Sequence, residues 1–126
     1  MKSEPHIRHL DDYDWETRPG RTDGVRWKLL VDADRGPSHG FSLGILQFPP
    51  GTVLAPHRHG PQEVYWVREG RGALRLGEET RQVDPGTIVY IPENHLHGIE
   101  NIGTEPLTLM WLFPTDTWAE VEYLFE

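Results

Sequence analysis

The sequence predicts a single all-β domain built as an antiparallel β-barrel, and three observations support this prediction. The chain has 126 residues, which is enough for one hydrophobic core and too few for two. Its 13 glycines and 11 prolines indicate many turns. Its apolar residues occur in short runs such as FSLGILQF and GTIVYI rather than at helical spacing. Many short strands separated by turns are typical of β-barrels and β-sandwiches.

The chain divides into an N-terminal arm at residues 1–24, a barrel at residues 25–114 and a C-terminal tail at residues 115–126. The arm is polar and acidic and carries a few aromatic residues. It could be a disordered lead, or it could lie along a barrel edge, its own or a partner's. The tail is expected to pack on the barrel or on a partner.

Within the barrel, runs of β-branched and aromatic residues predict the strands, and Gly- and Pro-bearing turns separate them. The expected strands outside the histidine-bearing stretch are residues 25–32, 41–48, 73–76 with a hairpin partner around Gly77, 87–91 and 107–113.

The tail carries two competing patterns. Thr117 with Glu120 resembles a helix capping box, whereas Val121, Tyr123 and Phe125 alternate as in a strand. We expect one helical turn followed by a strand.

Composition excludes several classes of function. The formal net charge of −8 argues against a nucleic-acid partner, because no basic patch outweighs the acidic surplus. No stretch approaches the roughly 20 apolar residues of a membrane span, and the N-terminus lacks the apolar segment of a secretory signal. These features predict a soluble, cytoplasmic protein without a membrane partner. The chain has no cysteine, so any metal must be held by nitrogen and oxygen atoms.

Two histidine clusters carry the chemistry. His57 and His59 are two residues apart, so on a strand both side chains project from the same face. A turn-forming Gly-Pro-Gln stretch then allows Glu63 to return to that face. The second cluster, His95 and His97, follows another proline-bearing turn.

The spacing around the two clusters resembles the two motifs of the cupin superfamily. The first pattern, G-x5-H-x-H-x3-E-x6-G, begins at Gly51, and the second, G-x5-P-x-N-x2-H-x3-N, begins at Gly86. The resemblance implies a small, single-domain, RmlC-like jelly roll. It departs from the family pattern at Asn94, where glycine is usual, but asparagine also tolerates a left-handed turn. The ligand set that the resemblance implies is His57, His59, Glu63 and His97.

Three imidazoles and one carboxylate suit one divalent transition metal, and a six-coordinate ion would keep two positions open for a substrate or for oxygen. Fe(II) and Mn(II) are favoured on these grounds, and Ni(II), Zn(II) and Co(II) are also compatible.

Two further residues are candidates for catalysis. His95 could face the pocket as a proton shuttle or an extra ligand, or it could lie on the rim as a solvated loop residue. Tyr65 shares the strand parity of Glu63, so it is expected to face inward with Val67, either lining the pocket or only filling the core. The remaining histidines carry no motif and are expected at the surface: His6, His9 and His39.

The last apolar strand has two possible inner faces. Either Leu109, Trp111 and Phe113 face the cavity, or Thr108, Met110 and Leu112 do. Both sets make a largely apolar pocket.

The leading interpretation is a metal-dependent enzyme that acts on a small organic molecule, with dioxygenase chemistry first because the ligand set suits iron(II) and the pocket is apolar. The alternative is a metal-dependent isomerase or lyase acting on a sugar-like or acidic metabolite. A non-catalytic module that binds or senses a small molecule or a metal is the alternative of a different class. The family resemblance implies a homodimer.

Overall fold

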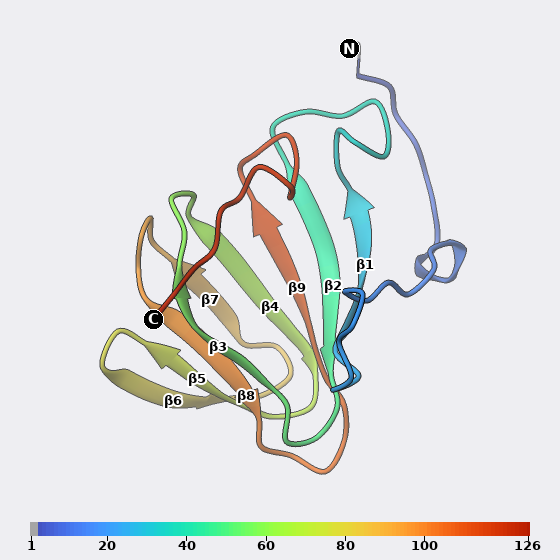
Figure 1. Ribbon diagram of the computed structural model, residues 1–126. Coiled ribbons are helices and arrows are strands. Elements are labelled where there is room, and N and C mark those ends of the chain that lie inside the picture. The colour runs from blue at the N-terminus through green and yellow to red at the C-terminus, as the bar shows by residue number, and fades with distance from the viewer. Residues whose placement is uncertain (1–2) are drawn as a thin grey trace.

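The computed structural model describes residues 3–126 and consists of two antiparallel five-stranded sheets that face each other (Figure 1). One sheet has the order β1-β2-β9-β4-β7 and the other β10-β3-β8-β5-β6. The strands are β1 (Arg26–Val31), β2 (Ser42–Phe48), β3 (Val53–Arg58), β4 (Glu63–Glu69), β5 (Gly72–Leu76), β6 (Glu79–Val83), β7 (Ile88–Ile91), β8 (His97–Asn101), β9 (Leu107–Phe113) and β10 (Leu124–Phe125).

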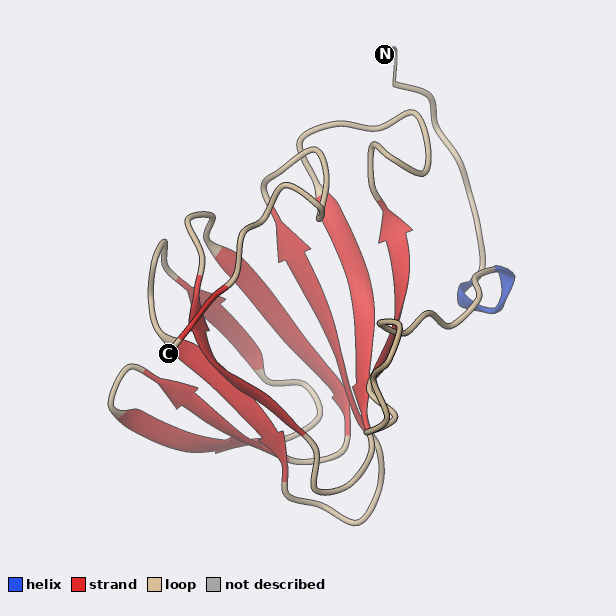
Figure 2. Ribbon diagram, in the orientation of Figure 1, coloured by secondary structure: helices blue, strands red, loops and turns tan. Residues whose placement is uncertain are grey.

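The all-β prediction is confirmed, and the arrangement of the two sheets is that of a jelly roll. Within residues 3–126 the one helical element is the short 3-10 helix η1 (Leu10–Asp12), which Figure 2 shows apart from the sheets. In this part of the chain, no helix has the length and apolar character that a membrane crossing requires.

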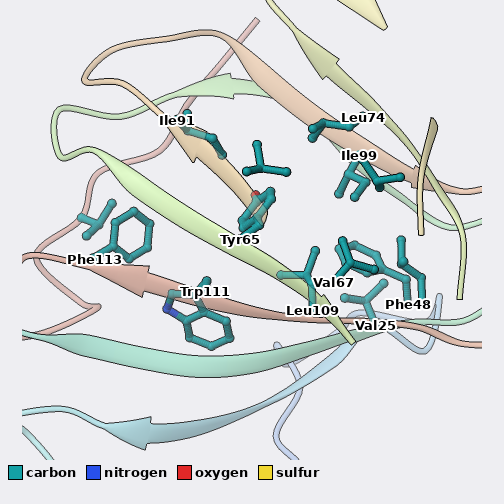
Figure 3. Packing of buried hydrophobic residues seen from close by; sticks show 14 of the residues in the cluster. Val25, Phe48, Tyr65, Val67, Leu74, Ile91, Ile99, Leu109, Trp111 and Phe113 are labelled. Atoms are coloured by element: carbon teal, nitrogen blue, oxygen red, sulfur yellow. The ribbon is translucent and has the colours of Figure 1, made fainter. Parts of the chain in front are cut away.

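Buried residues alternate along several strands, such as β4 and β7, as the pleat demands. Along β9, Leu109, Trp111 and Phe113 are buried, whereas Met110 and Leu112 are only partly so. The first of the two predicted faces therefore points into the core, although Thr108 on the opposite face is also buried. Figure 3 shows this packing between the two sheets.

The arm lies along β1, the edge strand of its own barrel. The backbones of Glu16 and Trp27 exchange two hydrogen bonds, of 2.7 and 2.9 Å. The Lys28 ammonium group donates to the Leu10 carbonyl at 3.0 Å, and it also lies over the ring of Trp15. The first two residues of the predicted arm lie outside the described residues.

The tail crosses to the other sheet. The Thr117 amide donates to the Glu120 carboxylate at 2.8 Å and the Glu120 amide donates back to the Thr117 hydroxyl at 3.3 Å. The capping pattern thus closes a turn, but this turn is not helical, unlike the expected one. After this turn β10 pairs with β3, with Phe125 opposite His57. The tail thus packs on its own barrel and ends beside the histidine motif.

Gly44 tests the packing between β2 and β9. It lies opposite Trp111, and a Cβ atom at this position would overlap the Trp111 indole. We expect Gly44→Ala to lower the free energy of unfolding by about 1–3 kcal/mol, because the core must shift to admit one methyl group. Urea unfolding monitored by circular dichroism measures the change. The matched control is Gly36→Ala, where the Cβ meets no atom within 4 Å; equal stability of the two variants would contradict this packing.

Candidate metal centre

The predicted ligands converge where β3, β4 and β8 meet. His57, the residue before the end of β3, lies directly opposite His97, the first residue of β8. His59 follows β3, and after a short turn Glu63 begins β4. All four residues are at most 3 % exposed, so the protein concentrates four polar side chains inside its core.

Each of the three imidazoles is oriented by a hydrogen bond to a nearby backbone carbonyl. A carbonyl oxygen only accepts, so the Nδ1 atom must carry a proton, and in a neutral imidazole the Nε2 atom is then left with its lone pair. The acceptors are the carbonyls of Ala55 for His57, of Pro61 for His59 and of His95 for His97, each at 2.8 Å. The ligand atoms of these three histidines lie within 4.8 Å of one another. Such fixed tautomers are the usual preparation of histidines for metal binding.

Glu63 brings a carboxylate to the same point. A hydrogen bond of 3.1 Å joins its Oε1 atom to His59 Nε2, which must carry a proton to donate. With the proton on Nδ1 this makes His59 an imidazolium while no ion is bound, and a metal ion would take the place of the Nε2 proton. The same Oε1 atom lies 3.3 Å from His97 Nε2, without hydrogen-bond geometry. The tight cluster is formed by the three histidines, and Glu63 supplies an adjacent oxygen donor.

Two of the Nε2 atoms, those of His57 and His97, are buried and have no hydrogen-bond partner among residues 3–126. A buried polar atom without a partner costs about 1–3 kcal/mol. A divalent cation bound by these lone pairs would remove that cost, and nitrogen with carboxylate oxygen is a donor set that suits a transition metal. The residues present therefore fit a metal ion.

Burial and charge act differently on the two histidines of the first motif. Burial lowers the pKa of His57 to about 4, so at pH 7 its imidazole is neutral and able to ligate. Burial also disfavours the charged form of His59, but the hydrogen bond and negative charge of Glu63 outweigh it and raise the pKa of His59.

Aromatic side chains cover the centre. The Tyr123 ring stacks on His57 with ring centroids 5.0 Å apart, and Phe125 lies 5.4 Å from the same imidazole. Phe113 meets His59 edge-on at 5.0 Å. The alternation of Val121, Tyr123 and Phe125 was visible in the sequence, but nothing there indicated that the tail reaches the histidines.

The two predicted catalytic residues lie in different environments. Tyr65 faces inward and is 2 % exposed, and its ring centroid is 6.1 Å from that of His97. Burial and the charge of Glu63 raise the pKa of Tyr65 well above its ordinary value. The His95 side chain is exposed in the loop before β8, where its backbone carbonyl rather than its ring reaches the centre.

The remaining predicted features lie outside the cluster. Asn94 adopts the expected left-handed conformation, with φ of 58°. The three histidines without a motif, His6, His9 and His39, are exposed.

The chain is similar to several known proteins. Residues 44–113, more than half of the chain, match the family model described as "Cupin domain". The chain is 33 % identical over 125 residues to the dimethylsulfoniopropionate lyase DddW of Ruegeria pomeroyi, a match that covers 96 % of this chain and 82 % of that protein.

The fold is also similar to that of several solved structures. The polyketide cyclase RemF of Streptomyces resistomycificus has a TM-score of 0.80 at 23 % identity, covering 97 % of this chain and 85 % of that one. The oxalate decarboxylase of Bacillus subtilis, described with Mn(II) centres, has a TM-score of 0.72 at 21 % identity, covering 86 % of this chain and 30 % of that one.

Replacement of one histidine tests the centre. We expect His97→Ala to weaken metal affinity by more than about 100-fold, because loss of supporting contacts alone costs about 10- to 100-fold. Isothermal titration with Mn²⁺ or Zn²⁺ on protein prepared without a histidine tag measures it. His39→Ala is the control, since His39 is exposed and lies outside the cluster. Full metal affinity in His97→Ala would remove this residue from the ligand set.

Proposed function

The chain belongs to the cupin domain family, and from this premise we propose that it is a metal-dependent lyase acting on a small organic acid. The observation that carries the proposal is the 33 % identity to a dimethylsulfoniopropionate lyase across 96 % of this chain. That similarity extends into the arm and the tail, beyond the residues that match the family model.

In this proposal His57, His59 and His97 hold a divalent metal through Nε2, and Glu63 completes the ligand set. Mn(II) and Fe(II) remain the favoured ions, and the Mn(II) centres of the structurally similar oxalate decarboxylase support the first of them. When bound, such an ion polarises a carboxyl oxygen of the substrate and so makes the neighbouring C–H more acidic.

The reaction that we infer is an elimination. The proton on the carbon next to the carboxyl group passes to a protein base, and the electrons of that C–H bond form a carbon–carbon double bond. The bond from the adjacent carbon to the leaving group breaks, and the leaving group keeps that electron pair. The products are an unsaturated acid and a free leaving group, with no change in the net oxidation state.

Tyr65 is the group to which we assign the proton transfer. It faces the interior beside His97, with ring centroids 6.1 Å apart, and is buried. The raised pKa of Tyr65 keeps its phenol protonated while no metal ion is bound. A bound cation nearby would lower this pKa and make the hydroxyl better able to exchange a proton. His95, on the exposed loop next to His97, is the second candidate for a proton carrier.

Dioxygenase chemistry is the second candidate function, because the aromatic cover of Phe113, Tyr123 and Phe125 gives the centre apolar surroundings suited to O₂. The two functions differ in one measurable respect, since only the dioxygenase consumes O₂.

A lyase assay therefore tests the proposal. We expect metal-loaded protein to release dimethyl sulfide and acrylate from dimethylsulfoniopropionate without O₂ uptake, measured by gas chromatography and an oxygen electrode. O₂ consumption matched to loss of a substrate would favour the dioxygenase. Binding of acids without any turnover would favour the non-catalytic module.

Substitution of the two candidate proton carriers separates their roles. We expect Tyr65→Phe to lower kcat by about 100-fold or more with unchanged metal content, since general acid–base groups contribute about 10²- to 10⁴-fold. His95→Ala should also keep its metal, because the backbone carbonyl is the part that holds His97. If Tyr65→Phe keeps full kcat and His95→Ala loses it, the proton transfer belongs to His95.

A further inference from the structure

A cavity of about 370 Å³ lies next to the metal centre, on the side where β1 and β2 face β3 and the tail. None of the four proposed ligands lines this cavity, which we call the side chamber. Tyr123 and Phe125 line the side chamber and also pack against the ring of His57. The occupant of the chamber would therefore contact the same aromatic rings that cover the metal ligands.

The lining of the side chamber is mostly apolar, and its charged residues are basic. Five aromatic residues line it, among them Trp27, Phe48 and Trp118, together with aliphatic side chains. The charged residues of the lining are two arginines from the arm, Arg18 and Arg21, and no acidic residue lines it. In a chain with a formal net charge of −8, a chamber with two cations and no anion favours a negatively charged ligand.

One of the two guanidinium groups is already compensated. Arg21 donates to the Asp23 carboxylate at 2.7 Å, which also lowers the pKa of Asp23. Arg18 forms no ion pair with any residue from 3 to 126. Arg35, which lines a neighbouring cavity together with Arg18, is paired with Glu16. The chamber thus offers one uncompensated positive charge.

The docking of the arm on β1 holds the backbone next to Arg18. The backbone hydrogen bonds between Glu16 and Trp27 lie just before it, and the Thr17 hydroxyl donates to the Val25 carbonyl at 3.1 Å. Both Trp27 and Val25 line the side chamber, so the segment that carries Arg18 is tied to the chamber wall.

We propose that the side chamber binds a small organic monocarboxylate with an apolar chain, the carboxylate at Arg18 and the chain among the aromatic walls. One uncompensated guanidinium matches one carboxylate, since arginine binds this group through paired hydrogen bonds. A volume of about 370 Å³ corresponds to about a dozen groups of the size of a water molecule. A chain of six to eight carbons fits this estimate.

The site goes beyond the proposed function, because it uses none of the metal ligands and does not require the chain to be a lyase. Only the biological role of the side chamber rests on the proposed lyase function. In an enzyme that acts on organic acids, the side chamber would bind the acid beside the metal centre.

Binding of hexanoate and octanoate to metal-free protein tests the inference directly. Trp27 and Trp118 line the chamber, so tryptophan fluorescence should report occupancy. We expect both carboxylates to bind and to be much stronger ligands than hexylamine and 1-octanol, which match the chain but not the charge. Equal binding of acid, amine and alcohol, or no binding of either acid, would overturn the proposal.

Three variants locate the carboxylate. We expect Arg18→Gln to weaken octanoate binding by about 10-fold or more, the usual effect of losing a charge-assisted hydrogen bond. Asp23→Asn should tighten it by about 2- to 5-fold, because it releases Arg21 from an exposed ion pair. Arg81→Gln is the control, since Arg81 lies on the distant β6 and pairs with Glu79. An unchanged affinity in Arg18→Gln would contradict the assignment.

The two proposals fail separately. Lyase activity without octanoate binding would overturn the side chamber and leave the proposed function intact. Charge-dependent octanoate binding without lyase activity would overturn the proposed function and leave the chamber intact.

Discussion

The candidate metal centre depends on three hydrogen bonds from histidine Nδ1 atoms to backbone carbonyls. In each case the acceptor lies two residues from the histidine, so the local course of the chain sets the direction of the ring. The three Nε2 atoms converge before any ion is bound, and the Nε2 proton of His59 is the one that an ion would displace. Such preorganisation reduces the reorganisation that metal binding would otherwise require.

The two sheets supply the rest of the constraint. Antiparallel pairing of β3 with β8 places His57 opposite His97, and the turn before β4 brings Glu63 beside both His59 and His97. Burial of polar groups costs folding free energy unless they form hydrogen bonds. This cost is not offset at the Nε2 atoms of His57 and His97, which have no partner among residues 3–126. The tail increases the free-energy cost of burying His57, because Tyr123 covers the His57 ring. Stability and metal binding are therefore coupled in this fold.

Much of the site could be predicted because strand parity and turn chemistry act locally. Spacing placed His57 and His59 on one face, and Asn94 could be expected to turn the chain before His97. Parity could not say which face of β9 is interior, since that depends on the opposite sheet. The contact of Tyr123 with His57 joins residues 66 positions apart, and no local pattern encodes it. The homodimer and the cytoplasmic location remain predictions.

The most direct measurement of the central claim is long-range ¹H–¹⁵N NMR of the histidine rings in protein loaded with diamagnetic Zn²⁺. The account predicts that His57, His59 and His97 all carry a proton on Nδ1 and bind the ion through Nε2. Ligation through Nδ1 in any of the three, or rings with the shifts of free imidazole at saturating Zn²⁺, would contradict it.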